Sequence, residues 1–284
     1  MKNENILIIG SKGQLGRALQ LKYPGATAVD SDALDITDKM ALKIFDWFNV
    51  RVIINAAAYT NVDGAETTEG RITAWKVNAL ATSYLTDIAL EHGISLIHIS
   101  TDYVFDGTNE NHKEDEPCSP LSVYGASKAA GDIATSLLPK HYILRTSWVI
   151  GEGNNFVRTM LGLAQKGINP IVVDDQIGRL TFTSEIVRAI DYLLEHSCPF
   201  GVYNVTNSGD PASWAGIARE IFKIAGYNNT VTGITTAEYY KGKPDIAPRP
   251  LNSIMDLEKL HQTKFDSRSW QEDLNEYIKK ELEK

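Results

Sequence analysis

Hydrophobic residues in the first 150 positions form short β-branched runs, separated by longer stretches in which apolar residues recur every three or four positions. The runs predict buried strands at Ile6–Ile9, Ala26–Val29, Val52–Ile54, Ser95–Ile99 and Tyr142–Leu144. The longer stretches predict helices at Gln14–Leu21, Lys39–Phe48, Ile72–His92 and Val123–Leu138. Strands that alternate with helices form parallel sheets through right-handed crossovers. The pattern therefore predicts an α/β fold with a doubly wound parallel sheet.

After Trp148 the pattern changes to shorter elements separated by Pro and Gly. These predict helices or strands at Asn155–Gln165, Ile171–Val173, Ser184–Glu195, Val202–Val205, Trp214–Ala225 and Trp270–Leu282. We expect residues 1–150 to form a nucleotide-binding domain. Residues 151–284 are expected to form mainly a smaller C-terminal α/β substrate-binding domain, with some segments returning to the first domain. We interpret the apolar face of the Trp214 helix as ordinary core packing.

Three glycines, Gly10, Gly13 and Gly16, follow the first predicted strand and open the first helix. The first permits a tight turn, the second lets a pyrophosphate approach the backbone, and the third lets helix and strand pack closely. This combination is typical of the Rossmann dinucleotide-binding turn, although the spacing is G-x-x-G-x-x-G rather than G-x-G-x-x-G.

The second strand ends at Asp30, and Asp35 follows shortly after it. A carboxylate at this place accepts hydrogen bonds from the adenosine ribose and disfavours a 2′-phosphate, which favours NADH. Lys12 in the glycine turn could instead attract that phosphate, so the cofactor is NADPH or NADH. Asp35 could equally cap the next helix. Small residues after the third strand, Ala56–Ala58, would let a cofactor lie against the backbone.

Three polar side chains predict the chemistry. Thr101 follows the fourth strand, where open α/β folds bind ligands, and Tyr124 and Lys128 lie four residues apart on the next helix. We expect the ammonium to reach the phenol and lower its pKa, so that Tyr124 donates a proton. The long stretch Ser100–Leu121 is interpreted as a substrate flap, and Lys241–Asn252 as another wall of the same cleft.

The composition and charge of the chain argue against several kinds of binding partner. The 284 residues are 43% hydrophobic and carry a net charge of −8, which argues against a nucleic-acid partner. The first apolar run is too short for a signal peptide or a membrane span, so we expect a cytoplasmic protein without a membrane partner. Cys118 and Cys198 are expected to be free thiols, and no set of residues indicates a metal.

In this order the segments resemble the extended short-chain dehydrogenase/reductase superfamily, and within it the dTDP-4-dehydrorhamnose reductases. The motifs that carry the narrower resemblance are N-A-A-A-Y-T-x-V-D at Asn55–Asp63, S-T-D-Y-V-F-D-G at Ser100–Gly107, Y-G-x-S-K at Tyr124–Lys128, R-T-S-W-V at Arg145–Val149, G-N-N-F at Gly153–Phe156 and R-P-x-N-S at Arg249–Ser253.

The resemblance implies reduction of the C4 ketone of a dTDP-sugar by a monomer or homodimer, with Thr101, Tyr124 and Lys128 as catalytic residues. It implies that Asn78 supports the lysine through water. It further implies two sets of binding residues. The cofactor set is Gly10, Gly13, Gln14, Leu15, Gly16, Asp30, Asp35, Ile36, Ala56, Ala57, Ala58, Tyr124 and Lys128, and the substrate set is Tyr103, Trp148, Asn155 and Arg249.

Two alternative functions also fit parts of the sequence, a nucleotide-sugar dehydratase and a non-catalytic regulator. Related nucleotide-sugar dehydratases also have a threonine at this strand end, but they usually follow it with Asp-Glu, whereas Thr101 is followed by Asp102 and Tyr103. The superfamily also resembles a non-catalytic regulator, the regulatory subunit of methionine adenosyltransferase. Such a regulator has no need for an intact set of Thr101, Tyr124 and Lys128.

Overall fold

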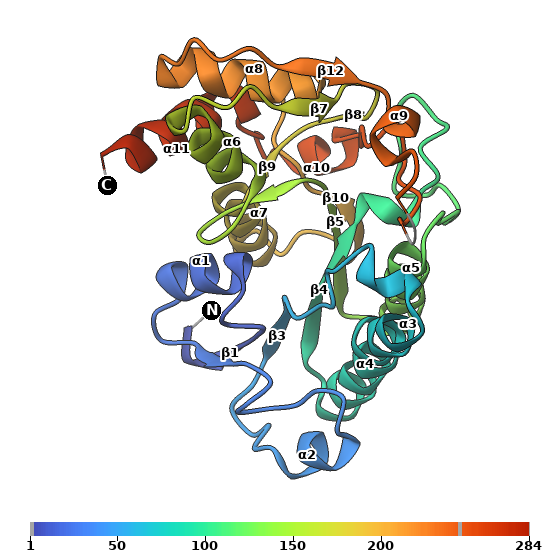
Figure 1. Ribbon diagram of the computed structural model, residues 1–284. Helices are drawn as coiled ribbons and strands as arrows, with labels where there is room; N and C mark the ends of the chain where they lie inside the picture. The colour runs from blue at the N-terminus through green and yellow to red at the C-terminus, as the bar shows by residue number, and fades with distance from the viewer. Residues whose placement is uncertain (1–2, 244–245, 284) are drawn as a thin grey trace.

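A six-stranded parallel sheet forms the centre of the computed structural model, which describes residues 3–243 and 246–283 (Figure 1). Its strand order is β10-β5-β4-β3-β1-β2, and each neighbouring pair is parallel. The predicted doubly wound fold is confirmed, with all five predicted strands present. The strands are β1 (Ile6–Ile9), β2 (Thr27–Val29), β3 (Val52–Asn55), β4 (Ser95–Thr101), β5 (His141–Thr146) and β10 (Gly201–Asn204).

Helices cover both faces of this sheet. On one face α1 (Gln14–Lys22) and α7 (Thr183–Glu195) pack on alternate strand residues such as Ile6 and Ile8. On the other face α2 (Lys39–Ile44) and α4 (Ala81–His92) pack on Leu7 and Ile9, and α5 (Val123–Ser136) lies beside α4 (Figure 1). Because successive strand side chains point to opposite faces, two buried faces explain why the strands are almost continuously hydrophobic.

The helix predicted at Lys39–Phe48 is shorter than expected. It begins after Asp38, whose carboxylate accepts hydrogen bonds from the amides of Met40 and Ala41, and it ends at Ile44. Beyond that point the indole of Trp47 folds back and donates to the Leu42 carbonyl at 2.8 Å. The apolar spacing up to Phe48 therefore continued past the end of the helix.

The stretch predicted as one helix at Ile72–His92 begins earlier and has three parts. They are α3 (Thr68–Ala74), a π-helical segment η3 (Trp75–Leu80) and α4. Within η3 the buried Asn78 side chain accepts from the Tyr59 amide at 2.8 Å and donates to Ser127 Oγ at 3.0 Å. Wider helical turns of this kind are frequent at functional sites.

Much of the second half of the chain, apart from α7 and β10, forms a cap over the carboxyl edge of the sheet (Figure 1). Its core holds α6 (Phe156–Gln165), α8 (Trp214–Ala225) and α11 (Trp270–Leu282), packed with β7 (Ile171–Val173). The sequence analysis missed several short elements, because two to five residues carry no readable period. They are β6 (Val149–Ile150), β8 (Ile177–Gly178), β9 (Thr181–Phe182), β11 (Ala212–Ser213), β12 (Thr232–Ile234), α9 (Thr236–Tyr240), α10 (Glu258–Gln262) and the 3-10 segments η1 (Asn3–Asn5), η2 (Gly64–Glu66) and η4 (Asp102–Val104).

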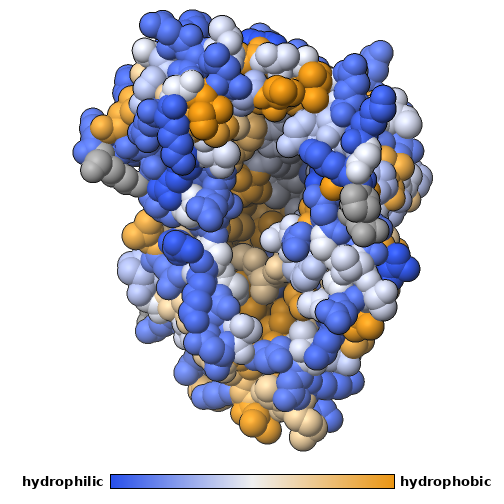
Figure 2. Space-filling view, viewed as in Figure 1, coloured by the Kyte–Doolittle hydropathy of each residue, from blue (hydrophilic) through white to orange (hydrophobic). Residues whose placement is uncertain are grey.

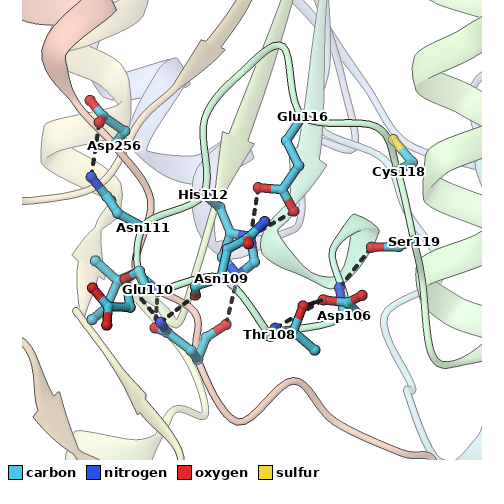
Figure 3. Close-up of polar contacts among 12 residues, drawn as sticks. Asp106, Thr108, Asn109, Glu110, Asn111, His112, Glu116, Cys118, Ser119 and Asp256 are labelled. Atoms are coloured by element: carbon cyan, nitrogen blue, oxygen red, sulfur yellow. Dashed lines mark hydrogen bonds and ion pairs between the residues drawn. The ribbon is translucent and has the colours of Figure 1, made fainter.

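The loop that follows η4 is anchored rather than free (Figure 3). The ring of His112 is fully buried, and its Nδ1 lies 2.9 Å from a carboxylate oxygen of Glu116. Asn111 donates to Asp256 at 2.8 Å, and Glu114 accepts from the Asn204 amide of β10 at 3.0 Å. These contacts tie the loop to the edge of the sheet. The interpretation of the whole stretch as a flap over the cleft therefore does not hold beyond its first residues.

Both cysteines are free thiols, as expected. Within residues 3–243 and 246–283 no helix has the length and apolar character needed to span a bilayer.

Candidate active site

Two adjoining cavities follow the carboxyl edge of the sheet at the place where β1 and β3 lie side by side. Their volumes are ≈ 260 Å³ and ≈ 480 Å³, and both are bordered by Gly13, Ala56 and Ala58. Figure 2 shows a deep hollow on this face of the molecule, with hydrophobic residues along its floor. The carboxyl edge of an open parallel sheet is where such folds bind ligands.

Gly10 and Gly16 form a corner that no larger residue could form. Gly10 has a φ of +83°, and a Cβ atom there would lie 2.6 Å from the Ala57 amide nitrogen. A Cβ atom on Gly16 would lie 2.1 Å from the Gly10 carbonyl oxygen. Gly13 is the N-cap of α1 and provides no side-chain capping bond. The backbone at this helix start is therefore suited to an anion such as a pyrophosphate, which fits a dinucleotide.

The smaller cavity is lined by Asp30, Asp35 and Ile36, the residues predicted to hold the adenosine end of the cofactor. Asp30 accepts a hydrogen bond from the Lys12 amide at 2.9 Å, and the Lys12 ammonium pairs with Asp32 at 2.9 Å. Asp35 accepts from both the amide and the hydroxyl of Thr37, which lowers the pKa of Asp35. The alternative that Asp35 caps the next helix is wrong, because Asp38 does so.

The larger cavity brings together Thr101, Tyr124 and Lys128, together with Gln14 and Leu15 from the start of α1. Ser122 caps α5 and places Tyr124 in its first turn. The Thr101 hydroxyl donates to Asp102 at 3.0 Å, and Thr101 lies close enough to Tyr124 to lower the pKa of the phenol in part. A strand end and a helix start thus place two hydroxyls side by side.

The charge states of this group differ from the sequence-based expectation. Burial raises the pKa of Tyr124 to about 12, and Lys128 is not among the groups that lower it. The Lys128 ammonium instead donates to the Ile99 carbonyl at 2.6 Å. Burial lowers the pKa of Lys128 to about 8, against the opposing effect of Asp132. The expected lowering of the Tyr124 pKa by Lys128 is therefore wrong for this structure, because desolvation outweighs the charge.

The predicted substrate residues lie in three places. Tyr103 and Trp148 line the larger cavity, with the Tyr103 ring 5.6 Å from the Tyr124 ring. Asn155 is the N-cap of α6 and donates to the Tyr277 hydroxyl at 2.8 Å. Arg249 pairs with Asp63 at 2.9 Å and lines a separate cavity of ≈ 540 Å³.

A family model described as RmlD substrate binding domain matches residues 4–283 of the chain. The chain belongs to this family. A dTDP-4-dehydrorhamnose reductase from Aggregatibacter actinomycetemcomitans is 42% identical over 279 residues, covering 90% of this chain and 92% of the relative.

Solved structures agree with this assignment. A dTDP-4-dehydrorhamnose reductase from Clostridium acetobutylicum matches with a TM-score of 0.90 and 38% identity, covering 96% of this chain and 98% of the other. The reductase from Bacillus anthracis in complex with NADP matches with a TM-score of 0.88 and 34% identity, covering 97% and 98%.

In this member of the RmlD substrate-binding-domain family, sequence reasoning missed two further residues of the larger cavity. Trp214 stacks on Trp148 with 3.8 Å between ring centroids, so the first residue of its helix belongs to the cavity wall. The apolar spacing of the Trp214 helix predicts ordinary core packing and does not indicate a cavity residue. Asp102 is 3% exposed, and burial raises its pKa to about 6. The sequence signal that could have identified Asp102 as a cavity residue is its position directly after Thr101.

Proposed function

We propose that the chain catalyses the NAD(P)H-dependent reduction of the C4 ketone of dTDP-4-dehydro-β-L-rhamnose to dTDP-β-L-rhamnose. The observation that carries the proposal is that Thr101, Tyr124 and Lys128 share one cavity, which adjoins the glycine corner. The relatives named as dTDP-4-dehydrorhamnose reductases support the choice of substrate.

The cofactor, when bound, supplies a hydride to the carbonyl carbon. Its pyrophosphate would be held at the backbone of Gly10, Gly13 and Gly16, where Gln14 and Leu15 begin α1. Asp30, Asp35 and Ile36 would hold the adenosine end, and Ala56–Ala58 line the path between the two cavities.

Tyr124 and Thr101 act on the carbonyl oxygen. The Thr101 hydroxyl turns from Asp102 to donate to this oxygen and orient it, and Tyr124 donates its proton as negative charge develops there. A pKa raised to about 12 keeps Tyr124 protonated near neutral pH, so it is ready to act as the acid. The phenolate left behind needs a nearby positive charge. Lys128, four residues further along the same helix, provides that charge and holds the nicotinamide ribose.

The substrate contacts follow from the same layout. The aromatic faces of Tyr103 and Trp148 pack on the sugar or the base, and Arg249 pairs with the diphosphate. Arg249 would exchange its partner Asp63 for the substrate. Asn155 contributes by holding the start of α6 in place. We expect these roles to accompany a division into a nucleotide-binding part, residues 1–150, and a mainly substrate-binding part, residues 151–284, with some segments returning to the first part.

The test is oxidation of added NADPH or NADH in the presence of dTDP-4-dehydro-β-L-rhamnose, with the product identified by NMR spectroscopy. We expect stoichiometric nucleotide oxidation and formation of the 4-hydroxy sugar. Nucleotide binding without any turnover on dTDP-ketosugars would contradict the proposal and would indicate a cofactor-binding regulator.

A nucleotide-sugar dehydratase is the competing enzyme class. Such an enzyme needs a second acid–base group beside the first carboxyl, and here the residue after Asp102 is Tyr103, whose pKa burial raises above its usual range. Incubation with dTDP-glucose should therefore give no dehydrated product. Elimination of water without consumption of added nucleotide would favour the dehydratase.

A further inference from the structure

Lys128 belongs to a buried group of charged and polar side chains behind Tyr124, and the proposed reaction gives no role to the other members. Lys128 is 1% exposed, Asp132 4%, Arg145 5% and His98 0%. Ionised groups are costly to bury unless they are paired, so a cluster of this kind needs a reason.

Asp132 has one oxygen that is paired and one that is not. Its Oδ2 accepts a hydrogen bond from Arg145 Nε at 3.1 Å. Its Oδ1 is buried without a hydrogen-bond partner and lies 3.8 Å from His98 Nε2. The same ring nitrogen lies 3.5 Å from Lys128 Nζ. Asp132 follows Lys128 by four residues on α5, so both side chains lie on one face of the helix.

His98 provides no negative charge to pair with the Lys128 ammonium. Asn55 accepts from the Ala57 amide through Oδ1, so its NH2 group faces His98 Nδ1 at 3.3 Å, and that nitrogen is an acceptor. The ring proton is therefore on Nε2. Burial and the Lys128 charge both lower the pKa of His98, which keeps the ring neutral.

The titratable and charged groups around Lys128 come from its own helix and from strands β4 and β5. On its own helix they are Tyr124 and Asp132, on β4 it is the neutral His98, and on β5 it is Arg145, which reaches Asp132 rather than Lys128. Asp132 is the anion in this set. Arg145 holds one of its oxygens in place, and the other lies 3.8 Å from His98 Nε2, the ring nitrogen that Lys128 also approaches.

We propose that Asp132, fixed by Arg145, is a positioning residue that keeps Lys128 protonated in the buried site. The proposal deepens the function proposed above and rests on it. Burial alone lowers the pKa of Lys128 and Asp132 opposes this, so without Asp132 the ammonium would lose its proton at a lower pH. Activity that needs the cationic Lys128 would then fall off at a lower pH.

The test is the pH profile of kcat/KM for Asp132→Asn, with Asp273→Asn as the matched control. Asp273 is also buried, at 6% exposed, and also pairs with an arginine, with Arg268 Nε at 2.7 Å, but it lies on α11 outside the cavity lining. We expect the alkaline limb of the Asp132→Asn profile to move to lower pH by about one unit or more, which is about a fivefold loss of kcat/KM at pH 8 and approaches a tenfold loss at higher pH. Asp132→Glu should restore most of that loss, and Asp273→Asn should leave the limb in place.

A uniform loss of kcat at every pH, or a limb that stays in place, would overturn the proposal and leave Asp132 as a structural ion-pair partner. Should Asp132→Asn fail to fold, the Lys128 ammonium can be titrated directly by NMR of ¹³C-labelled lysine in the natural chain and in Asp132→Ser, which also removes the carboxylate. A midpoint unchanged by that substitution would also overturn it. This titration needs no turnover, so it separates failure of the proposal from failure of the proposed function.

Discussion

Lys12 and Lys128 stand at opposite ends of the cleft and carry their charges in contrasting surroundings. Lys12 lies in the glycine turn with its side chain 68% exposed, and its ion pair with Asp32 raises its pKa. Lys128 is 1% exposed, and burial lowers its pKa to about 8. Lysine is therefore a permanent cation at the Lys12 end of the cleft, whereas the lysine at the Lys128 end can lose its proton.

The difference in burial determines how strongly each lysine charge acts on its surroundings. Water and salt screen an exposed charge, so its effect on a ligand is small and adjustable. A buried charge is screened far less, so neighbours such as Asp132 decide its state. We therefore expect changes at the buried end to abolish chemistry, and side-chain changes at the exposed end to adjust nucleotide choice.

Tyr124→Phe tests the buried end and should have the largest effect. It removes the proton donor, so kcat should fall about 10²- to 10⁴-fold, while cofactor affinity measured by nucleotide fluorescence should stay nearly unchanged. Tyr227→Phe removes a hydroxyl outside both cavities and serves as the control. Hydride transfer in stopped-flow experiments at the natural rate would exclude the assigned role.

Gly16→Ala tests the backbone of the exposed end. The added Cβ would lie 2.1 Å from the Gly10 carbonyl oxygen, where only backbone can give way. We expect a loss of about 3 kcal/mol in the free energy of unfolding, together with loss of nucleotide binding in calorimetry.

Gly162→Ala is the control for this change. Gly162 lies within α6, and an added Cβ atom there would meet nothing within 4 Å. The control should therefore gain about 0.5–1 kcal/mol. Equal stability of the two variants in denaturant titrations would contradict the close packing of the glycine corner.

The sequence predicted the elements of the sheet and most of the cavity lining, because strands buried on both faces and the glycine turn each leave a local pattern. Thr101, Tyr124 and Lys128 were placed together from strand end and helix spacing alone. The pKa of Tyr124 was predicted wrongly, because desolvation depends on residues such as Val62 and Ile186 that reach the cavity from distant parts of the chain.

Other features lacked any local signal. The stack of Trp214 on Trp148 joins residues 66 positions apart, and no spacing rule connects them. Arg249 carries the expected charge, but its ion pair with Asp63 depends on how the cap folds back over the sheet. The π-helical turn contains Asn78, whose side chain bonds Tyr59 and Ser127, and the helical period of the sequence does not distinguish this turn from an α-helix.

Asp102→Asn tests whether the buried end makes stability depend on pH. Burial raises the pKa of Asp102 to about 6, above its unfolded value of 3.8, so the folded chain binds more protons between these values. Stability from this group is present below about pH 4 and is lost as the pH rises to about 6. Asp102→Asn cannot ionise, so it should be more stable than the natural chain at pH 8 by about 3 kcal/mol.

The measurement is chemical denaturation at pH 5 and pH 8, and Asp106→Asn gives a control of opposite sign. Hydrogen bonds from Thr108 lower the pKa of Asp106, so that carboxylate stabilises the fold above its unfolded pKa. Asp106→Asn should therefore lose stability at pH 8. An Asp102→Asn variant with the pH dependence of the natural chain would show that Asp102 does not titrate with a raised pKa.

Lys12→Ala tests the exposed end and should have the smallest effect. The pair with Asp32 is open to water, so we expect no measurable change in melting temperature. A 2′-phosphate would gain from the Lys12 cation, so NADPH affinity should fall more than NADH affinity, by less than about tenfold, and the difference should vanish near 1 M salt. Isothermal titration with both nucleotides at low and high salt measures this. A hundredfold, salt-insensitive loss of NADPH affinity would mean that Lys12 leaves Asp32 and becomes desolvated on the nucleotide, and the contrast with Lys128 would then disappear.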